Sequence, residues 1–64
     1  MPVSWKEITI EYNGKFIHGD YKIAGQTVIV KTVSGMKDAP LSGLTPLYLA
    51  KMLLRELARE GRAR

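Results

Sequence analysis

Apolar and polar side chains alternate along residues 5–12, which is the pattern of a strand with one buried face. The apolar positions are Ile8, Ile10 and Tyr12. Asn13-Gly14 follows directly and favours a two-residue type I′ turn, because both central positions of that turn need a positive φ. This turn pairs Ile10 with Ile17 and predicts a second strand over about residues 15–23. The two strands then bury the same face, which supports the hairpin.

A third strand is expected over residues 27–33, which are rich in Val, Ile and Thr. A two-residue loop at Gly25-Gln26 leaves Lys31 outside the core, whereas a three-residue loop would bury it. Burying an unpaired ammonium group is costly, so the shorter loop is expected. A short fourth edge strand over about residues 36–41 is possible. Pro40 is tolerated there because an edge strand need not donate every N–H group.

Residues 46–60 predict the single helix. Thr45 is a good N-cap, Pro46 suits the first helical position, and Gly61 favours the helix end. At 100° per residue, one set of apolar side chains forms a continuous arc that is expected to cover the sheet. This set is Leu47, Ala50, Leu53, Leu54, Leu57 and Ala58.

These elements predict one α+β domain over residues 1–64, built of two layers. It is a three-stranded antiparallel β-meander with one C-terminal helix packed on one face (β-β-β-α). Leu49 and Met52 fall outside the apolar arc and are expected at the edge of the core. Gly19, on the buried face of the second strand, is expected to let the helix backbone approach the sheet.

Composition narrows the class of protein. The chain has 64 residues and 45% hydrophobic positions, as in a small globular domain, and no cysteine. Domains this short bury only roughly 60% of the surface of the unfolded chain, so self-association would be a useful supplement. No apolar run approaches the ~20 residues of a membrane span, and the first residues lack the pattern of a signal peptide. We therefore expect a cytoplasmic protein that has no membrane partner.

No pattern of residues indicates catalysis. The chain has no glycine-rich phosphate-binding motif and no paired cysteines. The register places Glu7, His18 and Asp20 on one face, where a divalent cation would offset the two carboxylates. There is a simpler explanation without a metal ion. Lys31 lies beside Asp20 in the same register, so Glu7, Asp20 and Lys31 form a row in which the lysine offsets the repulsion between the carboxylates. The expectation is a protein that is not an enzyme, with no metal, cofactor or small-molecule substrate.

The uncovered face of the sheet is the first candidate binding surface. One helix covers one face only, so the apolar side chains predicted on the other face are exposed together. They are Trp5, Phe16, Ile29 and Val33. A patch of this kind is typical of a protein interface, although scattered apolar side chains are also common on ordinary surfaces. The leading hypothesis is an interaction module that binds a protein partner or a second copy of itself through this face.

The flank of the helix is the second candidate. Lys51, Arg55 and Arg59 recur every four residues with Tyr48 beside them, and Arg62 and Arg64 follow in the tail. With a net charge of +4, this stripe could contact phosphates, so nucleic-acid binding is the alternative hypothesis. An ordinary solvated flank, with its basic groups suited to the helix dipole, explains the same pattern.

The expected order of three strands and a helix resembles the arm-type DNA-binding domains of tyrosine integrases, which read DNA with their sheet. The open faces of those sheets are basic. Here Lys22 and Lys31 stand against three carboxylates, those of Glu7, Glu11 and Asp20. DNA binding through the sheet is therefore not expected.

Overall fold

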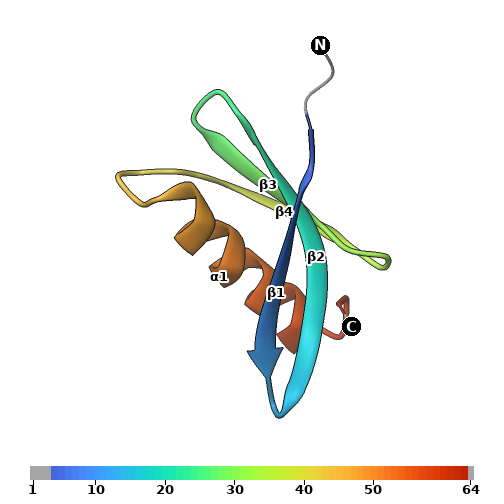
Figure 1. Cartoon of the computed structure of the whole chain (residues 1–64). Coiled ribbons are helices and arrows are strands. Elements are labelled where there is room, and N and C mark those ends of the chain that lie inside the picture. The colour runs from blue at the N-terminus through green and yellow to red at the C-terminus, as the bar shows by residue number, and fades with distance from the viewer. Residues whose placement is uncertain (1–3, 64) are drawn as a thin grey trace.

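Four strands precede the helix, and all of them join one antiparallel sheet in the order β1-β2-β3-β4. The computed structural model describes residues 4–63. Its elements are β1 (Lys6–Tyr12), β2 (Lys15–Ala24), β3 (Thr27–Lys31), β4 (Met36–Pro40) and α1 (Pro46–Arg59). The helix crosses one face of the sheet and leaves the other face open (Figure 1). The two-layer α+β architecture is confirmed, with four strands rather than three.

The turn residues set the register of the sheet. Asn13 and Gly14 have φ angles of 53° and 76°, as the first turn requires. Ile10 therefore pairs with Ile17, as the sequence predicts. The loop between β2 and β3 has the expected two residues, and it keeps Lys31 off the helix-covered face.

β4 pairs with β3 through hydrogen bonds that suit its proline. The N–H of Leu41 donates to the carbonyl of Gln26 at 2.8 Å, and the N–H of Thr32 donates to the carbonyl of Gly35 at 2.8 Å. Alternation of the antiparallel ladder then turns Pro40 toward the outer edge, where its missing N–H breaks no bond. The predicted fourth strand is therefore present, one residue shorter than expected.

β3 ends at Lys31, two residues earlier than the predicted end of that strand. The cause is a local turn around Thr32. Its hydroxyl oxygen accepts hydrogen bonds from the backbone N–H groups of Ser34 and Gly35, at 3.3 and 3.1 Å. Threonine side chains compete with strand pairing in this way. Val33 consequently lies in the turn and not in the strand.

The helix begins and ends as its capping residues predict. The Thr45 hydroxyl accepts from the backbone N–H of Tyr48 at 3.4 Å, and Pro46 occupies the first helical position. At the other end Gly61 has a φ of 75°, and the N–H of Arg62 donates to the carbonyl of Leu57 at 2.8 Å. This is a Schellman motif. No helix within residues 4–63 has the length and apolar character needed to cross a membrane.

The buried arc of the helix is turned relative to the prediction. Leu49 is buried, whereas Leu47 is 46% exposed and Ala58 is only partly buried. The fourth strand explains this correction, because it widens the sheet on one side and brings Ala39 and Leu41 against the core. The helix rotates its apolar side toward that wider edge. The buried helix residues are Leu49, Ala50, Leu53, Leu54 and Leu57.

Two further expectations about the core are corrected. Ile23 is 40% exposed, although it belongs to the helix-facing side of β2, because it lies at the end of the strand, next to the turn. At Gly19 a Cβ atom would lie 2.9 Å from the Leu54 side chain and 3.2 Å from the Lys31 carbonyl. Gly19 therefore makes room for the side chain of Leu54, and not for the helix backbone.

Candidate binding surfaces

Trp5 lies on the open face of the sheet, between two lysines. The Nζ atoms of Lys22 and Lys31 stand 4.7 and 4.2 Å from the centre of its ring. Trp5 is partly buried, because the lysine side chains cover it. Cation–π contacts of this kind stabilise the aromatic ring at the surface without a partner.

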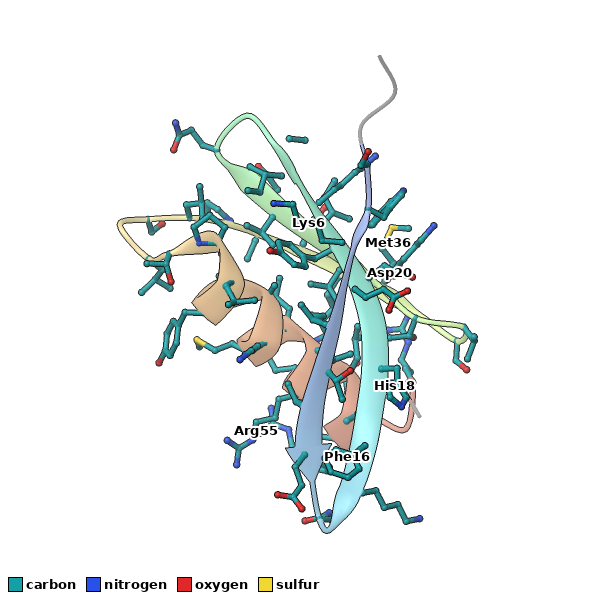
Figure 2. The ribbon with its side chains drawn as sticks, in the orientation of Figure 1. Lys6, Phe16, His18, Asp20, Met36 and Arg55 are labelled. Carbon is teal, nitrogen blue, oxygen red and sulfur yellow. The ribbon has the colours of Figure 1, made fainter. Side chains whose placement is uncertain are left out.

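The four predicted interface residues do not form one patch. Phe16 is 68% exposed, but it pairs with Glu11 beside the first turn (Figure 2). Lys22 lies six positions further along β2, which is roughly 20 Å along a strand. Val33 is 91% exposed and lies in the turn after β3. Of the other three, Ile29 is partly buried and pairs with Lys22, which contacts Trp5.

The middle of the open face has a hollow of about 530 Å³, whose lining includes several charged side chains. Glu7, Asp20 and Lys31 form one row across three strands, as the register predicts. His18 Nδ1 lies 3.1 Å from the Thr9 hydroxyl. Within residues 4–63 no three metal-ligating side chains are grouped so that they could hold an ion.

One flank of α1 carries the acidic residues, and these are paired. Lys37, on the helix-covered face of β4, places its Nζ 3.2 Å from Glu56 Oε1 and 2.5 Å from Glu60 Oε2. Hydrogen bonds to Glu60 and then to Glu56 raise the pKa of Lys37 above its ordinary value. The hydrogen bond from Lys37 lowers the pKa of Glu60. We call these three residues the acidic flank.

Arg62 joins the acidic flank and not the basic stripe. Its Nη1 lies 3.5 Å from Glu60 Oε1, and its carbonyl accepts from the Thr32 hydroxyl. A Cβ atom on Gly35 would come within 2.7 Å of the Arg62 Nε, so the side chain packs on that glycine. Arg64, the other predicted tail contact, lies outside the described residues.

The opposite flank of α1 carries the other three predicted phosphate contacts, and all of them are exposed: Lys51, Arg55 and Arg59. None of these cations forms an ion pair with another residue of the described part of the chain. Arg55 projects past β1 on the side away from β2, and its guanidinium lies 6.0 Å from the centre of the Tyr12 ring (Figure 2).

Two hollows of about 380 and 270 Å³ lie along this flank where it meets β1. Tyr48, Met52 and Arg55 line both hollows, so the two form one continuous depression. Glu11 and Glu56 stand at its margins. We call the surface the basic groove, made of Tyr12, Tyr48, Lys51, Met52, Arg55 and Arg59.

Tyr12 is the groove residue that the sequence did not predict. Its place in the alternating pattern assigned it to the core, and it is only partly buried. Its position at the end of β1, beside the turn, was the available signal, because the helix covers the strand ends least.

Comparison with protein-family models, with curated proteins and with solved structures finds no match to this chain.

Proposed function

We propose that this protein is a small non-enzymatic binding module whose ligand is nucleic acid, held in the basic groove. The observation that carries the proposal is the contrast in pairing on the helix. The acidic residues Glu56 and Glu60 are engaged by Lys37, whereas the stripe at Lys51, Arg55 and Arg59 is left without ion pairs in the described structure. We also propose that the protein binds this ligand in the cytoplasm.

The spacing of the stripe does not stabilise the helix, and of its three cations only Arg59 lies in the last turn, where the helix dipole favours a positive charge. Like charges four residues apart on a helix repel each other, which destabilises it slightly. An anionic ligand would remove that repulsion, and phosphates contact lysine and arginine side chains readily. Tyr48 and Tyr12 beside the stripe add aromatic surface for sugars and bases.

A second candidate is association with a protein partner, or with a second copy, through the Trp5 end of the open face. The supporting observation is that two apolar residues pair with the lysines that contact Trp5. Ile29 pairs with Lys22, and Met36, which is 56% exposed, pairs with Lys31. Sedimentation would show a mass near twice 7.2 kDa that falls on dilution if the protein pairs with itself. A mass that stays near 7.2 kDa at every concentration would remove self-association.

Fluorescence anisotropy with labelled DNA and RNA oligomers tests the leading proposal. Changing Lys51, Arg55 and Arg59 together to Gln should lower affinity at least tenfold. It should also reduce the slope of log affinity against log salt by about 2, at roughly 0.7 for each phosphate contact with a single strand.

The matched control changes three lysines of the sheet to Gln, which removes the same charge elsewhere: Lys6, Lys15 and Lys22. This variant should keep most of the affinity. Equal losses in both variants would mean that net charge, and not the basic groove, attracts the ligand. Failure of the unchanged protein to bind at low salt and ~100 μM would remove the proposal, because nonspecific binding usually registers by then.

A further inference from the structure

We infer that the nucleic acid bound by the basic groove is single-stranded, with unpaired bases stacking on Tyr48 and Tyr12. The inference rests on the proposed function and names its ligand more closely. Tyr12 ends strand β1 and Tyr48 stands in the first turns of α1, yet both line the same hollow of about 380 Å³. Two rings from separate elements therefore meet at one recess beside a row of cations.

The exposure of Tyr48 fits a stacking role. Its side chain is 56% exposed, and it projects from the flank of the helix and not from the core-facing side. An aromatic ring offers a face to any base, so stacking tolerates many sequences. Met52, which is 39% exposed, lines the same hollow and adds apolar surface to it.

Arg55 connects the aromatic and basic parts of the groove. Its guanidinium lies over Tyr12, 6.0 Å from the ring centre, while its neighbours in the stripe stand one helical turn before and after it. A planar guanidinium stacks on bases as well as on tyrosine, and it also pairs with phosphates. The groove thus provides stacking surfaces along one side and charges along the other, as in proteins that bind single strands.

The recess beside the stripe favours a single strand over a duplex as the ligand. Proteins read duplex bases by inserting a helix or a β-ribbon into the major groove. Tyr12 and Met52 line a recess, so they can touch only bases that are turned outward from a strand. Single strands present such bases freely, whereas a duplex keeps them stacked inside.

The test compares a labelled oligothymidine with the duplex that it forms with oligoadenine, using the full chain. The single strand should bind at least tenfold tighter. Tyr48→Ala should weaken binding of the single strand about tenfold, in the range found for one stacked base, and Tyr48→Phe should preserve it. Ring-proton resonances of Tyr48 should shift upfield when oligothymidine is added. Far-UV circular dichroism verifies that each variant folds.

Two results would overturn the inference and leave the proposed function standing. One is equal affinity for both probes. The other is unchanged affinity in Tyr48→Ala while the triple Gln variant of the stripe loses binding, since phosphates alone would then hold the ligand. If the unchanged protein binds neither probe, the proposed function fails together with the inference.

Discussion

The two flanks of helix α1 differ in what their charges contact. On the acidic flank Lys37 reaches Glu56 and Glu60, and Arg62 adds a further contact to Glu60. The flank beside β1 carries Lys51, Arg55 and Arg59 without an ion pair in the described residues. The first set of charges connects the helix to β4, whereas the second faces outward beside two tyrosines.

Under the proposed function, this difference separates charges that connect elements of the fold from charges that contact a ligand. A surface ion pair contributes little stability, but it positions both partners. On the acidic flank those contacts join the end of the helix to the edge strand. On the flank beside β1, the cations of the stripe form no ion pair that would connect the helix to the sheet in the described residues, so we infer that they serve binding. The predictions below test this separation.

Replacing Leu54 by Ala should have the largest effect on stability. Unfolding of the domain would separate the helix from the sheet and so remove both flanks. Leu54 is fully buried beneath the helix and packs where Gly19 leaves space. Loss of a buried leucine costs about 2–5 kcal/mol, which is enough to unfold much of a small domain. Chemical denaturation measures the change. A loss below about 1 kcal/mol would mean that Leu54 is not central to the core.

The triple Gln variant of Lys51, Arg55 and Arg59 should separate stability from binding. These side chains are exposed and lack ion pairs in the described structure, so the free energy of unfolding should change by less than about 0.5 kcal/mol. Affinity for the oligomers should fall at least tenfold. Urea titration and fluorescence anisotropy on the same samples provide both values. A clear loss of stability would show that the stripe supports the fold.

The elements of the fold were largely predictable, because each depends on local chemistry. Asn13-Gly14 determines the first hairpin, and Thr45 with Gly61 bounds the helix. The length of β3 was not predictable from its apolar pattern. A threonine hydroxyl at position 32 competes for the backbone N–H groups that would have continued the strand.

The candidate surfaces were harder to predict, because they depend on where elements end and how they cross. The alternation of side chains along the strands places Phe16 and Trp5 on the same face of the sheet. Alternation alone does not show that they lie at opposite ends of that face. Membership of Arg62 in the stripe was suggested by sequence proximity alone. The pairing of Lys37 with the helix depends on the fourth strand, whose existence was uncertain from the pattern.

Lys37→Gln should have a smaller effect than either earlier change, and mainly on stability. The substitution removes the cation that joins β4 to Glu56 and Glu60. The midpoint of urea unfolding should fall slightly, and affinity for oligomers should stay the same or fall slightly, because the two carboxylates lose their counter-charge. Lys51→Gln is the matched control and should show the reverse pattern. A stability loss in the control alone would reverse the roles assigned to the flanks.

Acid should weaken the acidic flank through Glu60. The hydrogen bond from Lys37 holds the pKa of Glu60 below its ordinary value of 4.5 in the folded protein. The folded state therefore prefers the carboxylate. Its contribution to stability is complete well above pH 4.5 and is lost as the pH falls through the lower, folded value. The raised pKa of Lys37 acts in the opposite direction, so its contribution is lost only as the pH rises beyond 10.5.

Comparing the unchanged protein with Lys37→Gln isolates this effect, which is the smallest predicted here because the groups are at the surface. Unfolding midpoints should differ most between about pH 5 and pH 10, where both contributions are present. The difference should shrink as the pH falls below 4.5. Other carboxylates also titrate in acid, but they contribute to both proteins, so the comparison removes them. A difference that stays constant down to pH 2 would show that Lys37 stabilises β4 by packing alone and not through its ion pairs with the helix.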